Sequence, residues 1–115
     1  MIIIDAPPGC SCPLVESIYG CDYCIIVTEP TPSGLHDIKA MSEILDEMDI
    51  PFGVILNKSE NFDKLENKKF LSPLIKIPFS REIYQETSNA RPFIKKMPEW
   101  IDIFHSVFER IEECI

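Results

Sequence analysis

Asp5, Glu29 and Asn57 each stand directly after a short apolar run of the chain. Such runs predict strands that are buried on both faces of a parallel sheet. Because ligands of open α/β sheets bind outside the carboxyl ends of the strands, we expect these three side chains at one edge. Asp5, which is followed by a Pro-Pro-Gly turn, is the first candidate for a residue with a chemical role. Glu29 is interpreted simply as a carboxylate in a loop.

The cysteines are a second group with chemical potential. Four thiols fall within fifteen positions, a number that would suit a zinc ion or an iron–sulfur cluster; they belong to Cys10, Cys12, Cys21 and Cys24. Cys24, however, lies in a predicted buried strand, where free cysteine is a common small apolar residue. The pattern therefore leaves two alternatives open, metal ligands or reduced thiols.

Alternating strands and helices must position these residues. Strands are predicted at Met1–Asp5, Tyr23–Thr28, Phe52–Leu56 and Leu74–Ile77. This order predicts an α/β fold, a parallel sheet of about four strands flanked by helices, in a single domain spanning residues 1–115.

Two helices are indicated clearly by their apolar periodicity. Between the second and third strands, apolar residues recur at three- and four-residue spacing from Leu35 to Met48, and Thr31 or Ser33 is expected to cap this helix. Near the C-terminus, Pro98 is followed by a wide apolar stripe in which Trp100 is interpreted as a packing residue.

The composition narrows the classes of partner. A net charge of −8 at pH 7 disfavours nucleic acid and anionic membranes, which both require a basic face. No apolar stretch approaches the roughly 20 residues that span a bilayer. The first residues also lack the basic and apolar segments of a signal peptide, so we expect a cytoplasmic protein.

Three motifs then resemble a known family in their order and spacing. Residues Ile4–Gly9, Val27–Asp37 and Ile50–Lys58 are similar to the MinD/ParA/Mrp group of P-loop ATPases, most of all to the MinD-like members that carry an inserted ferredoxin module. The resemblance implies a partial P-loop NTPase domain of the SIMIBI class, an ATP-binding and ATPase-type function, and ATP with Mg²⁺ as cofactors.

The first motif carries the catalytic residues that the resemblance implies. Asp5 would hold Mg²⁺ through water at the end of the Walker B strand. Pro8 and Gly9 would belong to the switch II turn that senses the γ-phosphate.

The later motifs carry the nucleotide-binding residues that the resemblance implies. Asn57 would hydrogen-bond the adenine edge, and the loop with Pro78 and Phe79 would pack near the base.

The sequence departs from this family in one large respect. None of its four glycines forms the G-x-x-x-x-G-K-[ST] loop whose backbone N–H groups cradle phosphates. We therefore expect weak nucleotide binding and no ATP hydrolysis by this chain alone. Because the family that it resembles consists of ATPases, whether the protein is an enzyme stays open. Without the strand that leads into that loop, the sheet would expose an apolar edge, which predicts a homo-oligomer or a partner chain that completes it.

The alternative function is a non-enzymatic oligomerisation or metal-binding module. Members of the wider group place paired cysteines at a two-fold interface, and Cys10 and Cys12 stand just after the switch II motif. By this resemblance the two residues would bind zinc, nickel or an iron–sulfur cluster between two subunits.

Overall fold

A parallel sheet of three strands organises the computed structural model, which describes residues 1–60 and 72–115. The strands are β1 (Cys24–Thr28), β2 (Phe52–Leu56) and β3 (Ile75–Lys76), in the spatial order β1-β2-β3. The register pairs Ile26 with Val54 and Ile55 with Ile75. The α/β fold with a parallel sheet is thereby confirmed.

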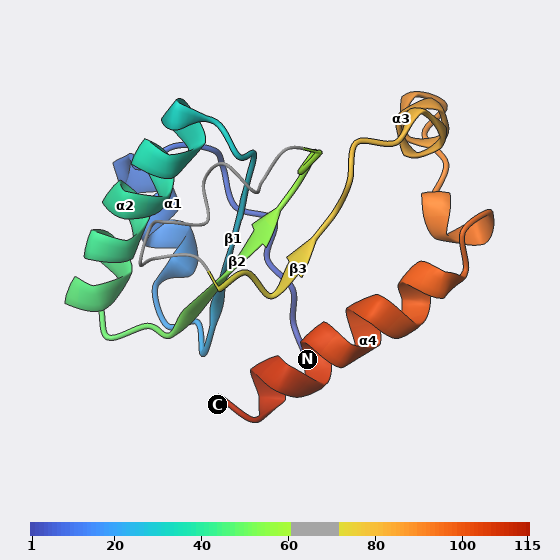
Figure 1. The fold of residues 1–115 in the computed structure, drawn as a ribbon. Helices are drawn as coiled ribbons and strands as arrows, with labels where there is room; N and C mark the ends of the chain where they lie inside the picture. The colour runs from blue at the N-terminus through green and yellow to red at the C-terminus, as the bar shows by residue number, and fades with distance from the viewer. Residues whose placement is uncertain (61–71) are drawn as a thin grey trace.

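Helices cover both faces of this sheet. Figure 1 shows α1 (Cys12–Ile18) and α2 (Pro32–Glu47) on one face and α4 (Glu99–Glu112) on the other. A helix α3 (Arg81–Ser88) and a 3-10 turn η2 (Phe93–Lys95) connect β3 to α4. None of the helices in the described part of the chain is long and apolar enough to cross a bilayer.

The main core lies between the sheet and α1 with α2. Leu45 of α2 and Leu56 of β2 are fully buried in it, and Leu14 and Ile18 of α1 join them. The helix α2 buries one side because its apolar residues recur every three or four positions, as predicted. Its cap is Thr31, one of the two residues proposed from the sequence.

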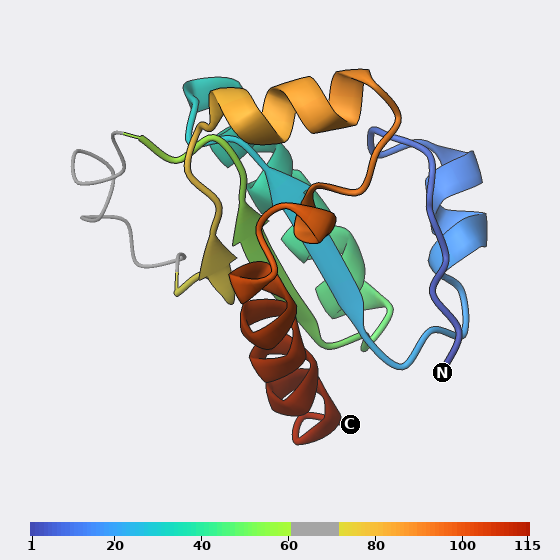
Figure 2. The ribbon, with the colours of Figure 1, turned by 90° about the vertical axis from the view of Figure 1, so that its right-hand side faces the viewer.

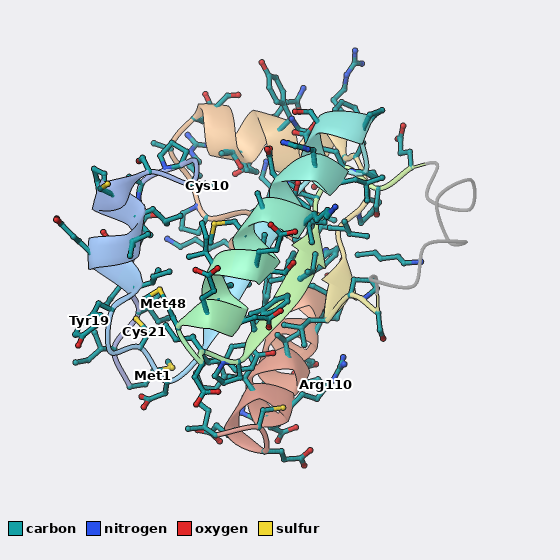
Figure 3. All side chains as sticks on the ribbon, turned by 90° about the vertical axis from the view of Figure 1, so that its left-hand side faces the viewer. Met1, Cys10, Tyr19, Cys21, Met48 and Arg110 are labelled. Atoms are coloured by element: carbon teal, nitrogen blue, oxygen red, sulfur yellow. The ribbon has the colours of Figure 1, made fainter. Side chains whose placement is uncertain are left out.

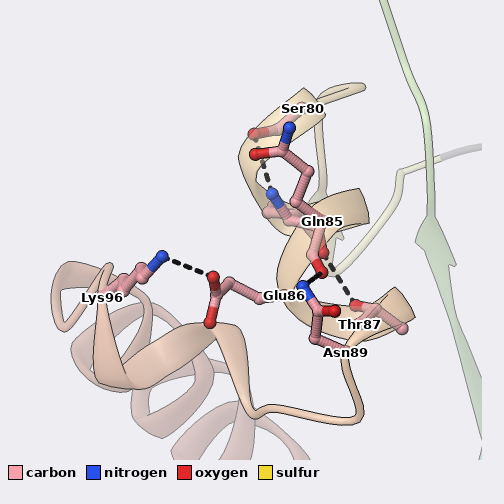
Figure 4. Close-up of polar contacts among 7 residues, drawn as sticks. Ser80, Gln85, Glu86, Thr87, Asn89 and Lys96 are labelled. Carbon is pink, nitrogen blue, oxygen red and sulfur yellow. Dashed lines mark hydrogen bonds and ion pairs between the residues drawn. The ribbon is translucent and has the colours of Figure 1, made fainter.

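A second apolar cluster holds the C-terminal part together. Trp100 is buried, and its ring lies 6.0 Å from the Phe93 ring in an edge-on arrangement, so its predicted packing role is confirmed. Close by, Glu86 of α3 is buried and its Oε1 lies 2.5 Å from Lys96 Nζ, as Figure 4 shows. This ion pair satisfies a buried carboxylate that would otherwise destabilise the fold.

One strand of the prediction is wrong. Residues Met1–Asp5 form no strand, and the sheet of the described residues has three strands instead of about four. Met1, Ile2 and Ile3 are about four-fifths exposed or more. The physical reason is that a strand needs a neighbour for its backbone N–H and C=O groups, and no described residues pair with this segment.

Candidate functional site

The carboxyl ends of β1 and β2 meet, and they bring the predicted polar residues of these two strands together. The Asn57 N–H donates to the Thr28 carbonyl oxygen at 2.7 Å, so the turns that follow the two strands lie side by side. Glu29 and Asn57 therefore share one edge of the sheet, as predicted. Asp5 does not join them at the end of a strand, because its segment is outside the sheet.

An ion pair that the sequence analysis missed links the two turns. Lys58 Nζ lies 2.7 Å from Glu29 Oε1, and both side chains are about half exposed. Lys58 adopts a left-handed backbone conformation (φ 53°), and its N–H donates to Asn57 Oδ1 at 3.0 Å. The Asn57 side-chain oxygen is thus engaged within its own turn. The sequence did contain a signal for this ion pair. Glu29 and Lys58 carry opposite charges and follow two adjacent parallel strands.

An open hollow of about 260 Å³ lies over this ion pair. Its walls come from the two turns and the segment after β3; the lining residues are Glu29, Pro30, Thr31, Lys58, Glu60 and Phe79. Phe79 belongs to the loop that was predicted to pack near a nucleotide base, and its ring is half exposed. A half-exposed aromatic ring beside a charged pair provides a surface on which a flat, polar-edged ring can stack.

The N-terminus of α2 reaches the same edge of the sheet. The Gly34 N–H donates to Thr31 Oγ1 at 3.0 Å, which caps the first turn of the helix. A Cβ atom on Gly34 would lie 2.2 Å from the Glu29 carbonyl oxygen and 2.6 Å from Thr28 Oγ1. The absence of a side chain at Gly34 therefore lets α2 pack directly against the end of β1.

The structure does not bring the predicted catalytic residues into this hollow. Asp5, Pro8 and Gly9 are on the exposed segment before α1 and do not line it. No hydrogen bond or ion pair joins Asp5 to another of the described residues. Gly9 has a φ of 93° and turns the chain toward α1.

The four clustered cysteines divide into two separate pairs. Cys10 and Cys12 are exposed at the start of α1, whereas Cys21 and Cys24 follow its end and are partly buried. Figure 3 shows Cys10 and Cys21 at opposite ends of this helix. Seven helical residues span roughly 10 Å, too far for four thiolates to share one zinc ion at Zn–S distances of roughly 2.3 Å. The described residues contain no group of three or more metal-ligating side chains.

Burial raises the pKa of the Cys24 thiol above its ordinary value of 9.0, and the nearby Cys21 thiol raises it further. Burial also raises the pKa of the Tyr23 phenol, and Cys114 adds to this effect while Arg110 opposes it. Cys24 is thus a protonated thiol at neutral pH, which fits a packing role rather than that of a nucleophile.

These shifts predict that the fold weakens at alkaline pH. A group whose pKa is higher in the folded state contributes stability below its unfolded pKa, and this contribution disappears as pH rises through the folded pKa. We expect the free energy of unfolding, measured by urea denaturation, to fall above about pH 9. The decline should be shallower in Cys24→Ala and unchanged in the exposed control Cys10→Ala; equal slopes for Cys24→Ala and the wild-type protein would contradict the assignment.

Comparison with known proteins identifies two relatives in Methanocaldococcus jannaschii. Uncharacterized protein MJ0578 is 34% identical over 114 residues, which cover 98% of this chain and 40% of the relative. Uncharacterized protein MJ0579 is 28% identical over 108 residues, which cover 86% of this chain and 38% of the relative. The chain thus spans about two fifths of the length of these relatives. No family model and no solved structure matches it.

Proposed function

We propose that this chain supplies the adenine side of a nucleotide-binding site in an ATP-binding protein of the MinD/ParA/Mrp group. The observation that carries this proposal is the convergence of the turns after β1 and β2 with Phe79 around one hollow. The hollow lies outside the carboxyl ends of parallel strands, where α/β proteins bind their ligands. Phe79, which lines the hollow, stacks on the base. Asn57 and Pro78 are not among the lining residues; from the turns beside the hollow, Asn57 hydrogen-bonds the adenine edge and Pro78 supports the loop.

The residues around the hollow fit a base better than a triphosphate. Two carboxylates, those of Glu29 and Glu60, line the hollow. The ammonium group of Lys58 is already paired with Glu29. Phosphate groups require unpaired cations or consecutive backbone N–H groups. These residues therefore bind the base, and no hydrolytic step is assigned to them.

Magnesium and phosphate belong to the other half of the proposed site. By the resemblance, Asp5 would hold Mg²⁺ through water, and Pro8 with Gly9 would form the turn that senses the γ-phosphate. When bound, Mg²⁺ would neutralise phosphate charge. Asp5 lies outside the hollow in this structure, so the proposal gives this half of the site no geometry.

Titration of adenosine and of ATP–Mg²⁺ tests the proposal. We expect both ligands to bind with similar, roughly millimolar affinity, because the contacts are to the base. Amide shifts in nuclear magnetic resonance spectra should change at Asn57 and Phe79. Phe79→Ala should weaken binding about tenfold through lost stacking, and Asn57→Ala should weaken it less.

Tyr84→Ala is the matched control, because Tyr84 is an exposed aromatic residue on α3, outside the hollow. It should bind adenosine like the wild-type protein. Adenosine that shifts no amide near Asn57 or Phe79 would show that the hollow is not a base site. Micromolar binding of ATP–Mg²⁺ that is lost in Asn57→Ala would instead show that these residues suffice for the whole nucleotide.

The exposure of Cys10 and Cys12 favours a second candidate function, a metal-binding module shared by two copies of the chain. Two thiolates from each copy would supply four ligands to zinc, nickel or an iron–sulfur cluster. Elemental analysis of anaerobically purified protein should then find about one metal site per two chains. The double variant Cys10→Ser/Cys12→Ser should lose the metal, whereas Cys114→Ser, another exposed cysteine, should keep it. Metal-free wild-type protein would exclude this function.

A further inference from the structure

Cys21 and Cys24 form a Cys-x-x-Cys pair at the end of the sheet opposite to the hollow. Cys24 is the first residue of β1, whereas the hollow lies beyond the last one. The Cys21 N–H donates to the Ile18 carbonyl oxygen at 3.1 Å, which places Cys21 in the turn after α1. Figure 2 shows this α1–β1 loop at the lower end of β1, with α3 at the upper end. The pair is thus separate from the proposed base site.

Both thiols belong to the same face of the sheet. Side chains alternate between the two faces of a strand, so Cys24 points to the face of Ile26, which is buried beneath α1 and α2. Cys24 itself packs against this core. Cys21 follows α1 on the same face, and the chain bends at Asp22, between the two cysteines. The two thiols are close enough for Cys21 to raise the pKa of the Cys24 thiol.

The pair is accessible to a ligand. Both cysteines are partly exposed, so an ion can reach them from solvent. The Cys21 thiol interacts only weakly with the Ser17 carbonyl oxygen, at 3.9 Å. Redox-active Cys-x-x-Cys pairs carry a thiolate of lowered pKa, often at a helix N-terminus. This pair instead follows the end of α1, and the pKa of Cys24 is raised, so the site suits metal binding better than dithiol chemistry.

The number of ligands decides which metal suits the pair. Zn²⁺ sites use three or four protein ligands, and iron–sulfur clusters use four thiolates. Among residues 1–60 and 72–115, no third cysteine, histidine or carboxylate joins the pair. Thiolates select Cu(I), a soft ion that two thiolates in line can satisfy. Met48 packs against the same core as Cys24 and lies at the same end of the molecule as Cys21 in Figure 3, where it supplies apolar cover.

We propose that Cys21 and Cys24 bind one Cu(I) ion in each chain through two thiolates. Each thiol gives up its proton, two copper–sulfur bonds form, and no electron is transferred. With metal–sulfur bonds of roughly 2.3 Å in line, the two sulfur atoms of the loaded site stand roughly 4.6 Å apart. The inference depends neither on the nucleotide site nor on the metal shared through Cys10 and Cys12.

The test uses the full chain with its other three cysteines, Cys10, Cys12 and Cys114, replaced by serine. Cu(I) is offered without oxygen as its coloured complex with bicinchoninate. We expect each chain to take one Cu(I) ion from the chelator. About two protons should be released per ion at pH 7, where ordinary thiols are protonated. X-ray absorption should find two sulfur neighbours around the copper.

Cys21→Ser and Cys24→Ser each leave a single thiol in this background. Either change should weaken Cu(I) binding by more than about 100-fold, because the loss of even an outer-shell partner of a metal ligand costs about 10–100-fold. Met48→Leu is the matched control, since it keeps the volume and the apolar cover and removes only a sulfur that the proposal does not use. It should bind Cu(I) like the parent chain.

Circular dichroism verifies that each variant is folded. Cys24 packs against the core, whereas Cys21 lies in the turn outside it, so Cys21→Ser tests the proposal without disturbing the core. The proposal is wrong if the chain leaves Cu(I) with the chelator, or if Cys21→Ser takes up as much as the parent. Zn²⁺ bound as tightly as Cu(I), or a nitrogen or oxygen neighbour of the copper, would contradict the two-thiolate site. Loss of binding in Met48→Leu would contradict it too, because the thioether would then be a ligand.

Discussion

Replacing Leu56 by alanine is expected to lower the free energy of unfolding by about 3 kcal/mol. Leu56 is fully buried at the end of β2, in the core between the sheet and α2. Truncation removes its apolar contacts and leaves a cavity that the surrounding strands and helix fill only in part. A small domain is stable by only about 5–15 kcal/mol, so this single change removes a large share of its stability.

Urea denaturation followed by circular dichroism measures this loss. Ile101→Ala on α4 is the matched control, because the Ile101 side chain is 51% exposed and its truncation should cost less than about 0.5 kcal/mol. Leu56 directly precedes Asn57 and Lys58, so the variant should also broaden the amide resonances of the turn at the hollow. A Leu56→Ala protein as stable as Ile101→Ala would show that the core is not packed as described.

The strands β1 and β2 and the helix α2 could be predicted because their signals are local. Each strand is a short apolar run, and Pro51 separates α2 from β2. In α2 the spacing of Ile38, Met41 and Leu45 alone defines the buried side. These elements form with the neighbours that the chain itself provides, so sequence and structure agree.

The segment Met1–Asp5 shows where such local reasoning fails. Its composition is that of a buried strand, but a strand also requires a neighbour, and this requirement is not local. The apolar pattern predicts only that the segment can be buried. Whether it is buried depends on the strand that pairs with it, and residues 1–60 and 72–115, which the structure describes, supply no such strand.

Only part of the candidate site could be predicted from the sequence. The rule for parallel sheets placed Glu29 and Asn57 at one edge, because it needs only the order and direction of the strands. The ion pair of Glu29 with Lys58 was missed, because it depends on the left-handed conformation of Lys58. Backbone conformations of this kind are set by the turn as a whole rather than by one residue.

Gly34→Ala is expected to destabilise the protein by about 2 kcal/mol, although alanine is the better helix former by about 1 kcal/mol. The new Cβ would lie 2.2 Å from the Glu29 carbonyl oxygen. This neighbour is backbone, so α2 must move away from β1 to relieve the overlap. The movement would also displace the cap at Thr31, which lines the hollow.

Gly53→Ala is the matched control for this substitution. A Cβ on Gly53 would meet Leu74 Cδ1 at 2.5 Å, the Tyr23 hydroxyl at 2.6 Å and Leu74 Cγ at 2.8 Å, which are all side-chain atoms and can shift more easily than backbone. Thermal unfolding should therefore show a smaller loss, about 1 kcal/mol or less, for Gly53→Ala. Chemical shifts of Glu29 and Lys58 should change in Gly34→Ala and stay near their wild-type values in Gly53→Ala. A Gly34→Ala protein with wild-type stability would show that α2 does not contact the end of β1, and the geometry assigned to the hollow would be wrong.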